Sequence, residues 1–374
     1  MRICLIITSF TSGGAEMLVA NLAEAFSARG HETMVLALSD AAQVGNDPAM
    51  ERALIERLEG SGVTARSLGL RNRRNVAAAG IRLRRTLREF PPDVIHAHTA
   101  AALPAVAMAR PGSPVVLTHH NSRLSFPPWA FRLFDRVVAS YVAISDQCEA
   151  ATAAHAARPI RRIMNAASPH FQATAPRGAP SRDPVILAVG TISRQKDYPT
   201  LIRAARPLVA LLAPQGRRPR ICIAGGGEEM EGLQALVREE GAEDLVELLG
   251  VRSDIPALMR QADLYASSSL WEGFSIAMIE ALMSGLPIVA TNVAGNCEMV
   301  LPGRNGELVP ASDPRAMAAA MAAVLSDDRL YAALSEGALA SAKRFSIDTC
   351  ATEHLALYRD VSAGLRFASA PAVC

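Results

Sequence analysis

Two glutamates separated by seven residues frame the stretch Glu272-Gly273-Phe274-Ser275-Ile276-Ala277-Met278-Ile279-Glu280. A short apolar run precedes this stretch at Leu264–Ala266, and another follows it at Ile288–Ala290. The order predicts a strand, a loop, a helix and a second strand, which is the repeating pattern of a parallel α/β sheet. Because ligands of such sheets bind at the carboxyl ends of the strands, the stretch lies where a binding site is expected.

The same stretch has the chemistry of a sugar phosphate site. Gly273 lets the backbone approach a ligand closely, and Ser275 is expected to cap the apolar helix that follows. The unpaired N–H groups of the first helical turn attract phosphate. Since a carboxylate accepts two hydrogen bonds, Glu272 and Glu280 suit neighbouring sugar hydroxyls. On spacing alone, an exposed helix with ordinary glutamates is the favoured interpretation, because paired acidic residues are common on helices.

Working outward, apolar runs of strand length alternate with helical segments in two series. The first series has expected strands at Ile3–Ile7, Thr33–Leu38, Thr64–Leu68, Val94–Ala97, Val115–Thr118 and Tyr141–Ile144. The second has expected strands at Val185–Val189, Ile221–Ala224, Val246–Leu249, Leu264–Ala266, Ile288–Ala290 and Glu307–Val309. Residues 168–184 are rich in Pro, Gly, Ser and Arg, which is typical of a linker. We therefore expect an N-terminal domain over 1–167 and a C-terminal domain over 185–345.

Composition agrees with two soluble α/β domains. A chain of 374 residues exceeds the ~250–300 at which a single core stops growing. A formal charge of +2 argues against a nucleic-acid partner. The six cysteines form no Cys-x-x-Cys pair, so neither a zinc site nor a disulfide framework is predicted. No window approaches the ~20 apolar residues of a membrane span. We expect a cytoplasmic protein, soluble or peripheral at the inner face of the membrane.

Further motifs occur in a fixed order. They are Ser12-Gly13-Gly14-Ala15-Glu16, Asp93-Val94-Ile95-His96-Ala97-His98, Thr118-His119-His120-Asn121, Val189-Gly190 through Lys196, Ala224-Gly225-Gly226-Gly227 and Leu249-Gly250-Val251. With the paired glutamates, this series over residues 1 to 345 resembles the retaining nucleotide-sugar glycosyltransferases of family 4. The resemblance implies the GT-B fold: two Rossmann-like, doubly wound parallel-sheet domains that face a central cleft. It also implies that residues 346–374 form a helix that crosses back to the N-terminal domain.

For activity, the resemblance implies transfer of a hexosyl or N-acetylhexosaminyl group from a nucleoside diphosphate sugar, with a uridine diphosphate sugar favoured. The expected acceptor is a hydroxyl of a saccharide or lipid-linked saccharide, in the biosynthesis of cell-surface glycans or glycolipids. Retention at the anomeric carbon needs no protein nucleophile, and positioning and electrostatics would carry catalysis. No cofactor is expected. No metal is expected either, because the chain lacks an Asp-x-Asp motif.

The resemblance also assigns roles to residues of this chain. Glu280 would bind the ribose, the backbone near Val251 the base, Lys196 the diphosphate and Glu272 the sugar hydroxyls. Family members often carry arginine where this chain has Thr191, so Arg194 is the nearest substitute for that cation. The expected catalytic group is Glu272, Lys196, Arg194 and His120. The expected donor-binding group is Gly13, Gly14, Gly227, Val251, Gly273, Phe274, Ser275 and Glu280.

An arginine-rich segment extends beyond these motifs. Seven arginines lie between positions 71 and 88, among them Arg73, Arg74, Arg82, Arg84 and Arg85. Basic amphipathic helices bind anionic membranes at about 1 kcal/mol per cation. A membrane surface is therefore a predicted partner, with Arg82, Arg84 and Arg85 as contacts. A solvated helix face is the alternative.

Three alternative functions share parts of this pattern. A nonhydrolysing sugar-nucleotide epimerase would release an altered sugar nucleotide without an acceptor. A phosphorylase would need pyridoxal phosphate on a lysine, and the chain has only Lys196 and Lys343. A non-catalytic partner subunit need not keep a donor site. The cluster Gly225–Gly227 does not continue as Gly-x-Gly-x-x-Gly, because Met230 occupies the last position, which argues against a nicotinamide cofactor.

Overall fold

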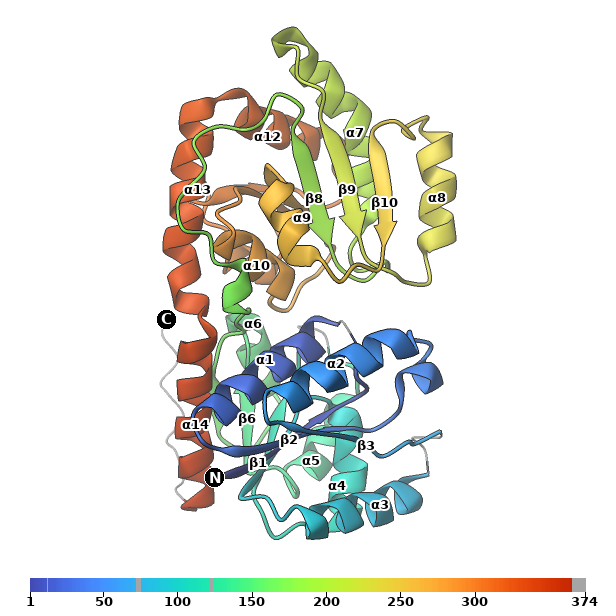
Figure 1. Cartoon of the computed structure of the whole chain (residues 1–374), viewed down its shortest axis with the longest axis vertical. Coiled ribbons are helices and arrows are strands. Elements are labelled where there is room, and N and C mark those ends of the chain that lie inside the picture. The colour runs from blue at the N-terminus through green and yellow to red at the C-terminus, as the bar shows by residue number, and fades with distance from the viewer. Residues whose placement is uncertain (12, 72–74, 121–123, 365–374) are drawn as a thin grey trace. The chain divides into compact units, whose positions relative to one another are not determined.

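The computed structural model describes residues 1–11, 13–71, 75–120 and 124–364 (Figure 1). Ser12, Arg73, Arg74 and Asn121, named in the motifs above, lie outside these ranges. The chain divides into two compact units. We call Met1–Asn165 with Ile347–Cys374 the N-terminal unit, and Ala166–Ser346 the C-terminal unit.

The N-terminal unit is built on a sheet of seven parallel strands in the order β3-β2-β1-β4-β5-β6-β7. The strands are β1 Arg2–Ile7, β2 Glu32–Ala37, β3 Thr64–Ser67, β4 Val94–Ala97, β5 Val115–Thr118, β6 Ser140–Ala143 and β7 Ile160–Arg162. The order reverses between β1 and β4, and in doubly wound folds ligands bind at the carboxyl ends of the strands at such a reversal.

Helices cover both faces of this sheet (Figure 1). They are α1 Gly14–Ala28, α2 Pro48–Gly60, α3 Val76–Glu89, α4 Leu103–Ala109, α5 Phe131–Phe134, α6 Asp146–Ala153 and α14 Ile347–Ser362. Alternate strand residues such as Cys4 and Ile6 form one core with Leu83 of α3 and Val106 of α4. On the opposite face α14 packs against α1, where Tyr358 meets the Phe26 ring edge-on at 5.8 Å.

The C-terminal unit repeats the arrangement with six parallel strands in the order β10-β9-β8-β11-β12-β13. Its strands are β8 Val185–Val189, β9 Arg220–Ala224, β10 Val246–Gly250, β11 Leu264–Ser267, β12 Ile288–Thr291 and β13 Gly306–Val309. Its helices are α7 Tyr198–Leu212, α8 Met230–Glu239, α9 Ile255–Gln261, α10 Ile276–Met283, α11 Ala294–Cys297, α12 Pro314–Ser326 and α13 Asp328–Ala342. The fold class expected from the sequence, two Rossmann-like parallel sheets, is confirmed.

Two segments differ from what their composition suggests. Strand β7 was not predicted, because Ile160-Arg161-Arg162 has no apolar pattern and becomes a strand only by pairing with β6. Residues 168–184, expected to be a linker, belong to the C-terminal unit. There the Arg177 guanidinium donates to the carbonyl oxygens of Ala262 and Met259, at 2.6 and 2.9 Å. A stretch without apolar periodicity is thus held by polar contacts to backbone.

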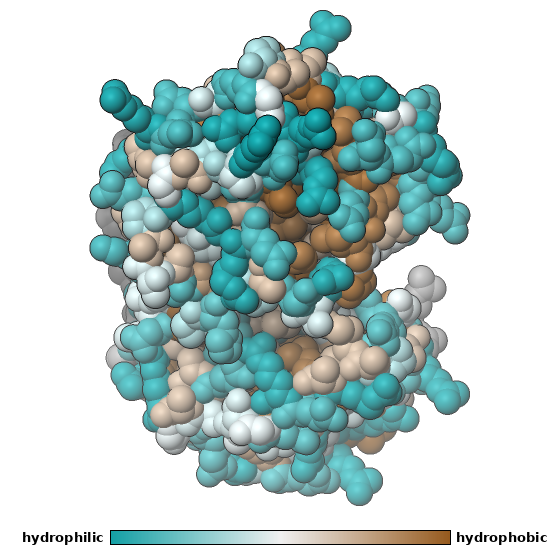
Figure 2. Space-filling view, turned by 45° about the horizontal axis from the view of Figure 1, so that its top comes forward, coloured by the Kyte–Doolittle hydropathy of each residue, from teal (hydrophilic) through white to brown (hydrophobic). Residues whose placement is uncertain are grey.

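Hydrophilic residues cover most of the face shown in Figure 2. Among the described residues, the large apolar side chains that remain exposed are Ile81, Met108, Trp129, Leu133, Leu211 and Val251. Within those same residues, no helix combines the length and apolar character that a membrane crossing requires.

Candidate active site

Lys196 and Glu272 meet at the carboxyl edge of the C-terminal sheet. Lys196 follows β8 and Glu272 follows β11, and these two strands pair directly although 74 residues separate the ends Val189 and Leu264. Their charged atoms, Nζ and Oε2, lie 2.6 Å apart. Both side chains are largely buried, with 17% and 9% of their areas exposed. The order reversal between β8 and β11 therefore brings the predicted cation and carboxylate into one ion pair.

Two neighbours of this ion pair were not predicted from the sequence. Ser269 donates from Oγ to Glu272 Oε2 at 3.2 Å, and Gln195 donates from Nε2 to Glu272 Oε1 at 3.4 Å. Gln195 also donates to the carbonyl oxygen of Trp271 at 3.0 Å. The serine run before Glu272 was a signal, since hydroxyls beside a buried carboxylate commonly bond it. Together these contacts fix the orientation of the Glu272 carboxylate.

Glu280 lies in α10, eight residues after Glu272. The expected cap of this helix is confirmed, because Ser275 Oγ accepts from the N–H of Met278 at 3.3 Å. Burial raises the pKa of the half-buried Glu280 carboxyl to about 8. In the described part of the chain no group bonds to this carboxyl. A carboxyl that is partly desolvated and unpaired is a natural acceptor for ligand hydroxyls.

The glycines beyond β8 and β9 serve close backbone packing. A Cβ on Gly225 would lie 1.9 Å from the carbonyl oxygen of Gly190, and one on Gly227 would lie 2.0 Å from that of Ile192. Gly227, predicted to bind the donor, is thus required by the contact between two loops. Val251, which follows β10, has 57% of its area exposed at the same edge of the sheet.

The remaining predicted residues of this unit occupy different environments. Arg194 is exposed, and no described residue pairs with its guanidinium. Phe274 is 4% exposed and meets the Phe345 ring edge-on at 5.5 Å, so its side chain packs into the unit. Gly273 is buried, and its carbonyl oxygen would lie 2.5 Å from a Cβ on Gly295. Gly295 was not predicted, although only a glycine allows α11 to approach this loop so closely.

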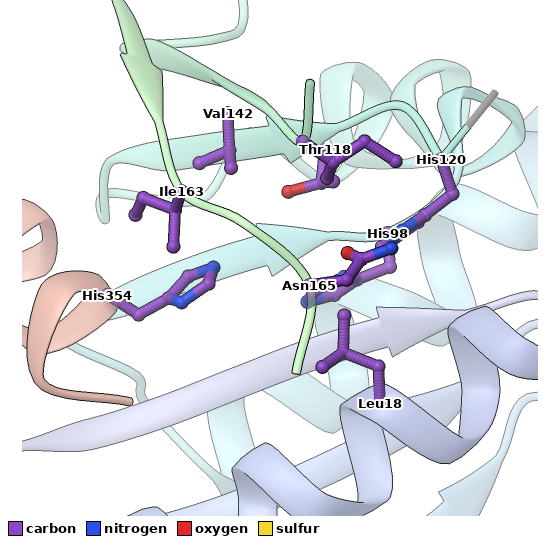
Figure 3. Close-up of a pocket in the computed structure, with 9 residues that line it drawn as sticks. Leu18, His98, Thr118, His120, Val142, Ile163, Asn165 and His354 are labelled. Atoms are coloured by element: carbon purple, nitrogen blue, oxygen red, sulfur yellow. The ribbon is translucent and has the colours of Figure 1, made fainter. Parts of the chain in front are cut away.

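Gly13, Gly14 and His120 belong to the N-terminal unit. Gly13 is the residue before α1, and Gly14 is the first residue of that helix. His120 lies two residues past β5, and its Nε2 is 3.0 Å from Nδ1 of His98, which follows the neighbouring strand β4. Figure 3 shows both histidines among the residues that line a narrow crevice, with Asn165 and with His354 of α14.

The arginines of α3 have contacts within the N-terminal unit. Arg82 donates from Nη1 to the carbonyl oxygens of Leu68 and Gly69, at 2.7 and 3.0 Å. Arg84 donates to two carbonyl oxygens at the end of α4, from Nε to Ala109 at 3.0 Å and from Nη2 to Met108 at 2.7 Å. Arg85, 85% exposed, lies 3.5 Å from Glu89. Two of the three predicted membrane contacts therefore fasten α3 to neighbouring elements.

No metal-ligand cluster is present in the described ranges: no group of three or more His, Cys, Asp or Glu side chains is arranged to hold an ion.

Comparison with known proteins identifies the family. The sequence profile of glycosyl transferases group 1 matches residues 172–340, and that of glycosyltransferase family 4 matches residues 12–170. The chain belongs to glycosyltransferase family 4.

Curated relatives of this glycosyltransferase act on several sugars and acceptors. It is 33% identical over 189 residues to the D-inositol 3-phosphate glycosyltransferase of Corynebacterium urealyticum, a match that covers 49% of this chain and 45% of the relative. It is 27% identical over 370 residues to the phosphatidyl-myo-inositol mannosyltransferase of Mycolicibacterium smegmatis, covering 95% of this chain and 92% of the relative. The chain thus matches less than half the length of the first relative and nearly all of the second.

Solved structures place the glycosyltransferase in the GT-B fold. The crystal structure of Anabaena HepE in complex with UDP and glucose superimposes with a TM-score of 0.76 at 21% identity, covering 96% of this chain and all of HepE.

Proposed function

We propose that this glycosyltransferase moves a hexosyl or N-acetylhexosaminyl group from a nucleoside diphosphate sugar to a saccharide hydroxyl, with retention and without a metal. One observation carries the proposal. The Lys196–Glu272 ion pair and the unpaired Glu280 carboxyl lie around the start of α10, at the edge of the sheet where ligands bind. A nucleoside diphosphate sugar has a diphosphate between two sugars. The cation suits the diphosphate, and the two carboxyl groups suit the sugars on either side of it.

Each group has a distinct part in this scheme. The Lys196 ammonium has three N–H donors, and Glu272 accepts from one, so two remain for the diphosphate. The first-turn amides of α10 add partial positive charge. Glu272, held by Lys196, Ser269 and Gln195, presents its remaining lone pairs to the transferred sugar. Glu280 accepts from the ribose hydroxyls.

Catalysis in this scheme is the stabilisation of charge on the leaving group. Negative charge grows on the diphosphate as the glycosidic bond breaks, and a preorganised cation is worth about 10²–10³ in rate. Lys196 has this part, with the exposed Arg194 as a second cation. The acceptor hydroxyl attacks from the side of the leaving group, and a phosphate oxygen takes its proton.

For the donor we propose a uridine diphosphate sugar, because HepE was solved with UDP and with UDP-glucose. For the acceptor we propose a saccharide or lipid-linked saccharide in the assembly of a surface glycan or glycolipid, following the mannosyltransferase of M. smegmatis, whose name specifies phosphatidyl-myo-inositol.

The test is product analysis by NMR after incubation with UDP-sugars and sugar acceptors, with and without EDTA. We expect a glycoside with the anomeric configuration of the donor, formed at the same rate in EDTA. An inverted product would contradict retention, and loss of activity in EDTA would contradict metal independence. A sugar nucleotide altered without an acceptor would identify an epimerase instead.

A further inference from the structure

Three histidines stand in a row where β4 and β5 end in the N-terminal unit. His96 is fully buried and both of its ring nitrogens are satisfied: Nδ1 lies 2.6 Å from the Tyr358 hydroxyl, and Nε2 lies 2.7 Å from Thr118 Oγ1. This histidine therefore has a complete structural role, which ties α14 to the sheet.

His98 and His120 differ from His96, because in each of them one ring nitrogen has a hydrogen-bond partner and the other has none. They share the 3.0 Å contact between His98 Nδ1 and His120 Nε2, and their rings stack with an interplanar angle of 16°. The other two nitrogens, His98 Nε2 and His120 Nδ1, are buried and have no hydrogen-bond partner in the described part of the chain. His98 as a whole is 7% exposed.

Leaving these nitrogens unpaired is costly. A buried polar group without a partner costs about 1–3 kcal/mol. Both nitrogens are buried, so bulk solvent does not satisfy them. His96, two residues earlier on the same strand, has partners for both of its nitrogens. A purely structural role does not account for the two free nitrogens of the pair.

The shared hydrogen bond determines what the free nitrogens offer. A neutral imidazole has one N–H donor and one acceptor nitrogen. One ring must donate in the shared bond, so one free nitrogen of the pair is a donor and the other is an acceptor. Burial, with smaller effects of neighbouring imidazoles, lowers the pKa of His120 to about 3 and that of His98 well below its usual value. Both rings are therefore neutral at pH 7.

We propose that His98 is a positioning residue: the hydrogen bond between His98 Nδ1 and His120 Nε2 couples the tautomers of the two rings, so that His98 controls whether His120 Nδ1 donates to or accepts from a hydroxyl of the sugar substrate. The sugar identity of the ligand rests on the proposed function, whereas the tautomer of His120 does not. Figure 3 shows the two rings beside each other in the crevice that they line.

Matched variants of His98 test the proposal. In His98→Asn the side-chain amide lies at about the position of the imidazole Nδ1. It can form a hydrogen bond with His120 Nε2 as donor or as acceptor. In His98→Gln the amide lies one carbon further out, and in His98→Phe the ring remains without nitrogens. We expect turnover to fall at least about tenfold in the Gln and Phe variants and to stay within about threefold of the parent in the Asn variant. His98→Phe should have no further effect in a His120→Phe background, because the two residues act as one unit.

A second readout is independent of activity. Nitrogen-15 NMR of the imidazoles reports which ring nitrogen carries the proton. We expect a single tautomer of His120 in the parent and in His98→Asn, and a changed or mixed tautomer in His98→Gln. The same His120 signals in His98→Gln and in the parent would overturn the proposal, even if no sugar donor were found. Absence of transfer with every nucleotide sugar would contradict the proposed function instead.

Discussion

Lys196 Nζ lies 2.6 Å from Glu272 Oε2, on loops that follow two strands adjacent in the sheet but distant in sequence. The pair is buried enough to be ordered, and it leaves ammonium protons for a ligand. The fold itself produces this relationship, because reversal of the strand order between β8 and β11 brings the two loops together.

Replacement of Lys196 separates rate from binding. In Lys196→Ala we expect turnover to fall about 10²–10³-fold, because the charge that the lysine stabilises develops mainly in the transition state. Glu272 loses its charged partner, so the free energy of unfolding should drop by about 1.5–3 kcal/mol. Steady-state kinetics and urea unfolding measure both effects. Lys343→Ala is the matched control, since the only other lysine is exposed and remote in sequence. Equal turnover in both variants would make Lys196 structural.

The raised pKa of Glu280 predicts a pH dependence of stability. Its pKa of about 8 in the folded chain exceeds the usual value near 4.5, so between these values the folded state holds a proton that the unfolded state has released. The stabilisation is present below pH 4.5 and is lost as the pH rises through 8. Glu280→Gln does not titrate there. We expect the parent to lose stability relative to this variant between pH 5 and pH 8 in urea unfolding. A constant difference would show that Glu280 is ionised throughout.

The buried histidines predict the opposite trend in acid. Burial lowers the pKa of His354 to about 4 and that of His120 to about 3, below the unfolded value of 6.5. Below pH 6.5 the unfolded chain binds protons that the folded chain does not, so stability falls with the pH. His354 alone accounts for up to about 3 kcal/mol between pH 6.5 and 4. His354→Leu should show a shallower acid loss in calorimetry, and an unchanged slope would count against a neutral His354.

The membrane prediction can be separated from the structural role of the same helix. Arg82 and Arg84 bond to carbonyl oxygens, whereas Arg85 is 85% exposed. We expect Arg85→Gln to weaken sedimentation with anionic vesicles without changing the melting temperature, and Arg82→Gln to lower the melting temperature. Binding should decline with salt, because exposed charges are screened over ~10 Å at 0.1 M. If the parent fails to sediment with anionic vesicles, or binds neutral ones equally, α3 is a solvated face.

The sequence predicted the strands with strong apolar runs, because burial on both faces requires them. It missed β7, whose Ile160-Arg161-Arg162 is a strand only through its pairing with β6. At the site, local patterns indicated Glu272 and the Ser275 cap, and the family resemblance indicated Lys196. It did not indicate Gln195 or Ser269, since their contacts with Glu272 depend on which strands are neighbours.

For the glycines and histidines too, the sequence indicated single residues but not the contacts that depend on how strands and loops lie next to one another. That Gly227 is needed for contact with Ile192 follows from the distance between two loops, which no local motif encodes. The sequence could name His120, but its partner His98 is set by the register of β4 against β5.

Donor binding by the C-terminal unit is the central claim, and calorimetric titration of UDP into the parent and into Glu280→Gln tests it most directly. In a titration at pH 9, above the Glu280 pKa of about 8, the variant removes the charge of the carboxyl that would accept from the ribose hydroxyls, a loss of about 1.5–3 kcal/mol or about 10- to 150-fold in Kd. Glu307→Gln, at a strand position of the same unit, serves as the control and should bind as the parent does. A Kd for Glu280→Gln equal to that of the parent would contradict the account.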